Sequence, residues 1–468
     1  HSEFRQFRLE GLNRYQMKAK TKRVTYTNPI FNNMSDEEIK EYQENMLRRQ
    51  LKYVYRNSEF YRRKFEEAGA HPEEIQTFED YQKLPIFMNK EIERKSQQES
   101  LDKYGHPFGM HLCASPDDIV FTGTTSGTSG QPTFTYTFTQ DDIQFLNRYI
   151  AHMLEYGGIQ SGERLLFSHS LGIYATSSIL WGVRSQGVLP IDVDVRAGSK
   201  MILKYAQLTK PSAAMMTPSL AEHLIDKAKE YGMDVGELKL RAIFAVGEIG
   251  VSVPEIKKRI ENAYGCRIYD YLGELGFSCD SDEYYGIHCV APDLNLFPND
   301  LIDPETKEPL EIYDGVIGER VVTEIGVKGL PRIRYASGDV IQVFTKECPG
   351  CGFKGRRVKM IGRSDDMLIV KGANVYPSAI KSVVANFIPE VTGEMRIVLD
   401  NPPPRVTPPL KLKLEYGETI DANQLPELEK RIKRALHTEA RLTPEIIWCE
   451  PGTLEKALTK TPLFEKNY

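Results

Sequence analysis

The 468-residue sequence predicts an α/β protein of two domains. The large N-terminal domain, residues 1–364, is expected to combine a doubly wound, mostly parallel sheet with a β-rich subdomain. A small, mobile α+β domain is expected over residues 365–468. Three observations favour this division: apolar stretches alternate with helical ones between residues 141 and 271, strand-rich segments follow residue 300, and both patterns mix after residue 362. A chain of this length is also too long for one hydrophobic core.

The first predicted elements are a pair of helices and a β-hairpin. Ser35 and the acidic residues Asp36-Glu37-Glu38 are typical of a helix start, and a charged helical stretch runs from there to about Ala68. Further on, Asp118–Phe121 and Thr133–Thr139 have the character of strands, and the second alternates aromatic and hydroxyl residues with period two. We expect the segment between them to be a loop that links two strands.

That loop indicates a phosphate-binding site. It reads Thr124-Thr125-Ser126-Gly127-Thr128-Ser129-Gly130-Gln131-Pro132-Thr133. Glycines permit positive φ, so backbone N–H groups can turn inward around phosphate oxygens, and the hydroxyls add donors. The loop lacks the lysine of a Walker A motif, so the phosphates must find a cation elsewhere. A flexible linker of the same composition is the alternative, against which the flanking strands argue.

Five strands alternate with helices in the next segment. We expect the strands at residues 164–168, 187–193, 213–216, 242–246 and 267–271. Such alternation predicts a parallel sheet covered on both faces, and sheets of this kind bind ligands at the carboxyl ends of their strands. Glu248 and Glu274 follow two of these strands. Each could equally serve as a carboxylate that caps a helix.

Strand-rich sequence follows residue 300, with strands expected near residues 318–323, 334–339 and 340–343. The last unit is expected to hold helices near residues 378–387 and 425–437. Its strands are expected near residues 395–399, 410–416 and 446–449. This mixture suits a small α+β domain.

Composition and charge exclude several classes of partner. Sixty basic and sixty-five acidic residues give a net charge of −5, which leaves no polybasic field for nucleic acid or an anionic membrane. No stretch approaches the length of an apolar membrane span and none resembles a secretion signal, so we expect a cytoplasmic protein. Small molecules are the expected partners, and the choice between a monomer and a homodimer stays open.

Four cysteine and histidine residues form a candidate metal site. Cys348 and Cys351 make a Cys-x₂-Cys knuckle, and Cys279 and His288 lie upstream. Tetrahedral zinc favours ligands of this kind, and its role would be structural. Cys289 competes with His288, because neighbouring side chains in an extended segment point to opposite sides. Buried free thiols are the alternative interpretation.

Four motifs now occur in order along the chain. They are the Ser/Thr/Gly loop, Glu274, Tyr335-Ala336-Ser337-Gly338-Asp339, and Gly362-Arg363-Ser364-Asp365-Asp366-Met367-Leu368-Ile369-Val370-Lys371-Gly372. Together they resemble the adenylate-forming superfamily of acyl-CoA synthetases, most closely its phenylacetate-CoA ligase branch, from about Leu51 to the C-terminus. The resemblance implies two steps. A carboxylate attacks the α-phosphate of ATP and releases pyrophosphate, and then the thiol of coenzyme A attacks the acyl-adenylate and releases AMP.

The resemblance also implies roles for single residues. The β- and γ-phosphates would bind to Thr125, Ser126, Gly127, Thr128, Ser129 and Gly130. Gly247 and Glu248 would lie along the adenine, Asp339 would accept both ribose hydroxyls, and Glu274 would bind Mg²⁺. Arg363 would reach toward the ribose or the phosphates. A carboxylate suits a vicinal diol because its two acceptor oxygens meet two donors.

Two further residues belong to the small domain and its junction. Lys456, in Pro451-Gly452-Thr453-Leu454-Glu455-Lys456-Ala457, resembles the adenylation lysine of the family, with Lys460 as its rival. It would bring a cation to the α-phosphate from outside the loop. Asp365 matches the family's hinge, about which the small domain would rotate between the two steps. A plain turn residue is the alternative for Asp365.

The acyl pocket implied by the resemblance draws on Tyr136, Tyr174, Val246, Tyr271, Gly273 and Phe277. Such an aromatic set suits a planar ring, although ordinary core packing would explain it as well. Gly273 stands where the family has Ser or Thr, which would leave extra room beside the adenylate. We therefore expect an aryl or arylacetic acid as substrate. The alternative functions are transfer of the acyl group to a carrier protein and nucleotide binding without catalysis.

Overall fold

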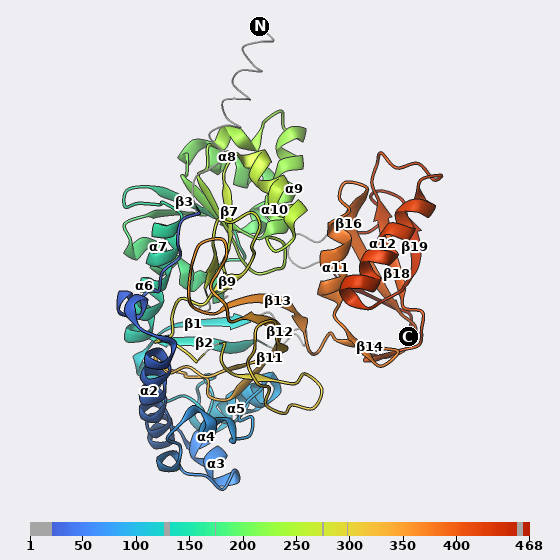
Figure 1. The fold of residues 1–468 in the computed structure, drawn as a ribbon. Helices are drawn as coiled ribbons and strands as arrows, with labels where there is room; N and C mark the ends of the chain where they lie inside the picture. The colour runs from blue at the N-terminus through green and yellow to red at the C-terminus, as the bar shows by residue number, and fades with distance from the viewer. Residues whose placement is uncertain (1–20, 126–131, 174, 274–275, 297, 456–461) are drawn as a thin grey trace.

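The computed structural model describes residues 21–125, 132–173, 175–273, 276–296, 298–455 and 462–468. A large body and a smaller C-terminal body are joined after β13 (Arg357–Arg363) (Figure 1). Parallel and antiparallel sheets occur together with helices, so the predicted α/β class is confirmed. None of the helices in the described ranges has both the length and the apolar character needed to cross a bilayer.

Helices form the N-terminal region, and the expected helix pair is present. They are α2 (Asp36–Asn57), α3 (Glu59–Glu67), α4 (Phe78–Gln82) and α5 (Lys90–Tyr104). Ser35 accepts from the backbone N–H of Glu38, and Glu38 accepts in return from the N–H of Ser35, so two unpaired donors at the start of α2 are satisfied. Short 3₁₀ turns lie at Pro29–Asn33, Pro72–Glu74, Pro116–Asp118, Ala175–Ser177, Val195–Ala197 and Val235–Leu238.

A five-stranded parallel sheet forms the centre of the large body, in the order β4-β3-β5-β6-β7. Its strands are β3 (Arg164–Phe167), β4 (Leu189–Asp192), β5 (Ala213–Met216), β6 (Ala242–Ala245) and β7 (Arg267–Asp270). The connecting helices are α6 (Gln140–Tyr156), α7 (Ser178–Ser185), α8 (Ser199–Thr209), α9 (Pro218–Glu230) and α10 (Pro254–Tyr264). All five strands lie where the sequence predicts them.

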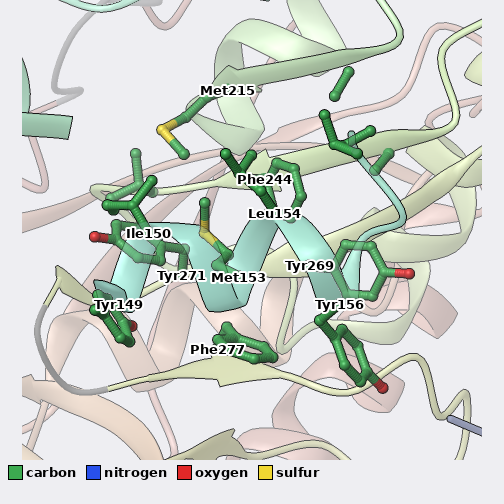
Figure 2. Close-up of a cluster of buried hydrophobic side chains, with 14 of the residues drawn as sticks. Tyr149, Ile150, Met153, Leu154, Tyr156, Met215, Phe244, Tyr269, Tyr271 and Phe277 are labelled. Carbon is green, nitrogen blue, oxygen red and sulfur yellow. The ribbon is translucent and has the colours of Figure 1, made fainter. Parts of the chain in front are cut away.

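Helices cover both faces of this sheet because neighbouring residues of each strand point to opposite sides. Met215 and Phe244 pack with Met153 and other residues of α6, a contact region shown in Figure 2. Met216 belongs instead to the cluster on the opposite face, together with Leu224 of α9. The strands β5 and β6 of this doubly wound arrangement are fully apolar and fully buried, as expected for a sheet covered on both sides.

Antiparallel strands make up the other two sheets of the large body. β1 (Ile119–Thr125) pairs with β2 (Thr133–Thr139), which confirms the predicted hairpin. A six-stranded sheet has the order β10-β11-β12-β13-β9-β8. Its other strands are β8 (Phe277–Ser278), β9 (Ile287–His288), β10 (Leu301–Ile302), β11 (Ile317–Val322) and β12 (Tyr335–Phe344). The two segments expected at 334–339 and 340–343 are one continuous strand, because β11 and β13 pair with it along its length.

The C-terminal body has its own hydrophobic core, which includes Leu368, Ile397 and Ile432. Helices α11 (Pro377–Ala385) and α12 (Leu425–Ala440) pack there with two small sheets. The strands are β14 (Leu368–Val370), β15 (Ala373–Val375), β16 (Val391–Leu399), β17 (Arg405–Val406), β18 (Lys411–Tyr416), β19 (Glu445–Cys449) and β20 (Phe464–Lys466). The expected α+β mixture is confirmed.

A buried ion pair joins the N-terminal helices to the six-stranded sheet. Arg334 lies 2.7 Å from Asp300 and also donates to the carbonyl of Leu84 at 2.8 Å. The exposed fractions of the two charged side chains are 2% and 0%. Burial raises the pKa of Asp300, and the charge of Arg334 opposes that rise. Each of the two charged side chains is therefore stabilised in the core by the other.

Replacing Arg334 with methionine is expected to lower the free energy of unfolding by about 3–5 kcal/mol, because Asp300 is left as a buried carboxylate without its partner. Urea denaturation measures the loss. The control is the double variant Arg334→Met/Asp300→Leu, which leaves no unpaired charge and is expected to recover much of the stability. A loss below about 1 kcal/mol in the single variant, the size expected of a surface pair, would contradict this account.

Candidate active site

One face of α5 lies against the β1–β2 hairpin, whose strands flank the predicted phosphate loop. Lys90, Arg94 and Gln97 follow one another at helical spacing, so their side chains project from the same side. Lys90 donates to the hydroxyls of Thr125 and Thr135, the latter at 3.1 Å. Arg94 donates to the Thr133 hydroxyl at 3.1 Å, and Gln97 accepts from the backbone N–H of Phe134 at 3.0 Å. Two cations therefore lie at the end of the hairpin where the strands meet the loop.

A short parallel contact with β12 fixes the position of Lys90 beside the hairpin. Met88 bridges to Tyr335, and its carbonyl accepts from the N–H of Ala336 at 2.9 Å. Asn89 then caps α5 by accepting from the N–H of Ile92, so the helix begins at Lys90 itself. The strand that carries the Tyr335–Asp339 motif thus also fixes the start of α5.

Positive charge converges around Lys90. Burial lowers its pKa from the ordinary value of 10.5, and the neighbouring charges of Arg94, Arg332 and Arg363 lower it further, whereas Glu93 raises it. Several cations gathered at a hairpin rich in hydroxyl groups make a site that favours an anion. Sequence reasoning found the loop but missed Lys90 and Arg94, because a contact between residues 35 positions apart leaves no local pattern.

Asp339 and Arg363 face each other on neighbouring strands. The register of β12 and β13 pairs the two residues directly, and Arg363 donates to the Asp339 carboxylate at 2.9 Å. Arg320 approaches the other carboxylate oxygen at 3.9 Å. Gly338 has a φ of +79°, and a Cβ at this position would lie 2.6 Å from a nitrogen of Arg363. A glycine is required here for the guanidinium to reach its place.

The same guanidinium also binds Asp365. Arg363 donates to the two Asp365 oxygens at 2.9 and 3.1 Å, which is a bidentate contact. Nearby, Ser378 of α11 donates to the carbonyl of Ile361 at 2.8 Å, so the C-terminal body touches β13 at its last residues. The structure therefore brings the predicted ribose carboxylate and the predicted hinge together at one arginine.

Gly247 and Glu248 follow β6 at the carboxyl edge of the parallel sheet. Gly247 has a φ of +98°, which favours glycine. The Glu248 carboxylate accepts from the backbone N–H of Ser219 at 2.6 Å, near the start of α9. The helix-capping role considered from the sequence is therefore observed for Glu248. The place of Gly247 and Glu248 along the adenine stays a prediction.

The predicted acyl-pocket residues occupy different surroundings. Tyr271 and Phe277 are buried under α6, where Tyr271 stacks on Tyr149 with ring centres 5.5 Å apart (Figure 2). Val246 belongs to the same cluster. Tyr136 lies on β2 with the Arg332 guanidinium over its ring, and a Cβ at Gly273 would meet no described atom within 4 Å. Their part in a substrate pocket stays a prediction.

The four predicted metal ligands lie together. The ligand atoms of Cys279, His288, Cys348 and Cys351 are all within 4.8 Å of one another, and all four residues are buried. His288 Nε2 is 3.3 Å from the sulfur of Cys351. Three thiols and one imidazole of this spacing fit tetrahedral zinc, whose bonds to sulfur are about 2.3 Å long.

The structure also separates His288 from Cys289. His288 lies on β9 and turns toward the knuckle after β12, whereas Cys289 packs with Ile341 and Val358 in another hydrophobic cluster. The alternation of side chains in an extended segment predicts that only one of the two residues faces the cluster, but it does not say which one. Among the described residues, Cys289 is not part of the group that could hold a metal.

Several predicted residues lie outside the described residues. They are Ser126, Gly127, Thr128, Ser129 and Gly130 of the loop, Tyr174 of the acyl pocket, Glu274 as the Mg²⁺ ligand, and Lys456 with its rival Lys460. Their roles stay predictions.

Comparison with known proteins decides the family. The model of the AMP-binding enzyme C-terminal domain matches residues 372–464. A phenylacetate-coenzyme A ligase of Pseudomonas putida is 30% identical over 355 residues, which cover 74% of this chain and 75% of that protein. The chain belongs to the phenylacetate-coenzyme A ligase family. A phenylacetate-coenzyme A ligase of Thermus thermophilus is 27% identical over 451 residues, covering 91% and 95% of the two chains.

As a member of the phenylacetate-coenzyme A ligase family, the chain is an enzyme that joins an acid to coenzyme A through an acyl-adenylate. The solved structure of 2-hydroxyisobutyryl-CoA ligase with 2-HIB-AMP, in its postadenylation state, has a TM-score of 0.80 at 26% identity, over 92% of this chain and 90% of that one. The same ligase in its thioesterification state has a TM-score of 0.65 at 26% identity, over 93% and 91%. The TM-score is thus higher against the postadenylation structure than against the thioesterification structure.

Proposed function

We propose that the chain is an ATP- and Mg²⁺-dependent ligase that converts an aryl or arylacetic acid to its coenzyme A thioester, with release of AMP and pyrophosphate. The observation that carries the proposal is the group of cations around the hairpin, beside the Asp339–Arg363 pair. Membership of the phenylacetate-coenzyme A ligase family and the relatives' names support the choice of acid.

The cation that the loop itself lacks is supplied, in this proposal, by Lys90. Its ammonium donates to Thr125, the first residue of the predicted phosphate-binding set, which runs to Gly130. Arg94 adds a second charge at the opposite strand of the hairpin. Preorganised cations stabilise the charge that pyrophosphate carries as it leaves, and they cost little reorganisation during the reaction.

The remaining contacts to ATP are assigned on the resemblance. Asp339 would accept the ribose hydroxyls, with Arg363 beside it, and Gly247 and Glu248 would lie along the adenine. Lys456 would bridge the attacking carboxylate and the α-phosphate. Glu274 would hold Mg²⁺, which supplies charge neutralisation at the phosphates when bound.

Rotation of a C-terminal domain that starts at residue 365 would separate the two steps. The bidentate contact of Asp365 with Arg363 lies at the junction of the two bodies, which supports a hinge there. Coenzyme A would enter beside the β14–β15 hairpin after the rotation. 2-Hydroxyisobutyryl-CoA ligase, which this chain resembles, has been solved in both a postadenylation and a thioesterification state. These two states support two such poses.

A zinc ion is proposed for the Cys279, His288, Cys348 and Cys351 cluster. It would tie the segment after the predicted Mg²⁺ ligand to the turn between β12 and β13. The role is structural, because all four positions of a tetrahedral ion are filled by protein.

The decisive experiment is ATP–pyrophosphate exchange over a panel of aryl, arylacetic, fatty and 2-hydroxy acids. We expect exchange with an aromatic acid, and Lys456→Ala is expected to lower its rate by about 10²–10³-fold because the charge at the transition state is lost. Lys466→Ala is the matched control, because this lysine belongs to strand β20 of the same domain. Absence of exchange with every acid would overturn the enzyme proposal, and exchange with 2-hydroxyisobutyrate alone would overturn the aromatic choice.

The acceptor is tested separately. With the best acid, coenzyme A is expected to yield a thioester and free AMP, whereas formation of adenylate without transfer to coenzyme A would favour a carrier protein. Thioester formation is followed by mass spectrometry.

A further inference from the structure

A buried carboxylate stands behind the phosphate-loop lysine. Glu93 lies one helical turn after Lys90 on α5, and its side chain has an exposed fraction of only 1%. One of its oxygens is 3.8 Å from the Lys90 nitrogen and accepts a hydrogen bond from the Tyr335 hydroxyl at 2.9 Å. A carboxylate is rarely buried so completely unless it is paired, so this placement calls for a reason.

The charges around Lys90 explain why an acidic residue is buried here. Arg94 on α5, Arg332 before β12 and Arg363 on β13 all repel its ammonium, and Glu93 is the acidic group that acts on it. Arg332 is itself paired with Glu324, and Arg363 with Asp339 and Asp365, so part of their repulsion is already offset. Without Glu93 the partly buried ammonium would still lie among these cations without an acidic partner among the described residues, and its protonated form would be disfavoured. An anion site needs the proton on Lys90 before the triphosphate arrives.

We propose that Glu93 is a positioning residue for ATP binding: its carboxylate balances the cations around Lys90 and holds the ammonium over Thr125 and Thr135. The inference rests on the proposed function, since it assumes that Lys90 binds the phosphates. It also assigns a role to Tyr335, the first residue of the Tyr335–Asp339 motif. Tyr335 lies on β12 with Asp339 and donates to Glu93 on α5. This hydrogen bond links the strand of the predicted ribose carboxylate to the helix that bears Lys90.

The sign of the pH effect follows from the geometry. Burial already lowers the pKa of Lys90, and Glu93 is the group that raises it. Removing the acid must therefore lower that pKa further. Phosphate binding is fully present while Lys90 is protonated and is lost as the pH rises through the pKa of Lys90. We call the pH above which ATP affinity falls the alkaline limit. In a Glu93 variant this limit should move to lower pH.

The test measures the affinity of α,β-methylene-ATP with Mg²⁺ for the full chain by calorimetry, from about pH 7 to about pH 10, the range in which a shifted lysine titrates. Glu93→Gln keeps the shape and an acceptor for Tyr335 but removes the charge. We expect its alkaline limit to fall by about one pH unit or more, and affinity to drop by about tenfold for each unit beyond the new limit. AMP, which lacks the β- and γ-phosphates, should bind to the variant and the wild type alike.

Two controls separate positioning from stability. Glu91→Gln removes an exposed acid from the same turn of α5, where it pairs with Lys95, and is expected to leave both the affinity and its pH profile unchanged. Tyr335→Phe removes the hydrogen bond to Glu93 but keeps the charge, so it should change the pH limit less than Glu93→Gln does. Circular dichroism confirms that each variant is folded.

A double-mutant cycle with Lys90→Met decides the assignment. If Glu93 acts through Lys90, Glu93→Gln costs nothing further in affinity once Lys90 has been replaced. Additive losses, or an unshifted pH limit in a folded Glu93→Gln protein, would overturn the inference. If Lys90→Met alone binds the nucleotide like the wild type, the phosphate role of Lys90 fails instead, and the two failures are told apart.

Discussion

Replacing Lys90 with methionine is expected to lower the rate of ATP–pyrophosphate exchange by about 10²–10³-fold, the usual cost of removing one preorganised donor from a developing charge. Methionine keeps an unbranched apolar chain nearly as long as the lysine stem and lacks the ammonium. Its loss leaves Thr125 and Thr135 without the donor that joins them across the hairpin. The affinity for α,β-methylene-ATP should fall as well, because the proposed role of Lys90 includes contact with the phosphates of the bound nucleotide.

Lys95→Met is the matched control for this prediction. Lys95 lies on the exposed side of α5, with a side chain 74% exposed and paired with Glu91. It carries the same charge on the same helix but does not face the hairpin, so the exchange rate should stay within about twofold of the wild type, as expected for a surface charge. Equal rates for Lys90→Met and the wild type would show that another cation serves the phosphates.

Substitution of Cys351 by serine is expected to abolish zinc binding and to lower the free energy of unfolding by about 3–5 kcal/mol. Structural zinc contributes strongly to folding, and a missing ligand leaves the remaining thiols and His288 buried without their ion. The wild-type chain should hold one zinc ion, since the cluster supplies four ligand atoms to a single point. Metal content is measured by mass spectrometry, and stability by urea denaturation with and without a chelator.

Cys289→Ala provides the comparison for the zinc prediction. This cysteine neighbours His288 in the chain but packs into the cluster of Ile341 and Val358. The variant is therefore expected to keep its zinc and to lose only the small packing contribution of one sulfur atom, about 1 kcal/mol. Full zinc content in Cys351→Ser, or none in the wild type after purification with zinc, would contradict a zinc site at this cluster.

The strands of the central sheet could be predicted because their signal is local. β5 and β6 are short apolar runs between helices, and burial on both faces explains why neither alternates. The end of α12 was harder to predict: the sequence predicts a helix near residues 425–437, whereas α12 continues to Ala440. Helix ends depend on capping and on the packing of neighbours, so their positions vary by a few residues.

The candidate site could be predicted only in part. The motifs locate Asp339 and Arg363, but their contact depends on the register of β12 and β13, which no single motif contains. Lys90 was missed because its link to the hairpin passes through the bridge between Met88 and Tyr335, two segments far apart in the sequence. For Glu248, the sequence left two roles open, contact with the adenine and capping of a helix. The structure shows the capping contact.

The position of Arg363 has a consequence for the order of events in a catalytic cycle. One guanidinium serves both Asp339 and Asp365, so a turn of the backbone that withdraws Asp365 leaves more of its positive charge to Asp339. If the smaller body rotates at Asp365 as proposed, the affinity for a nucleotide at Asp339 and the position of that body are coupled through the charge of Arg363.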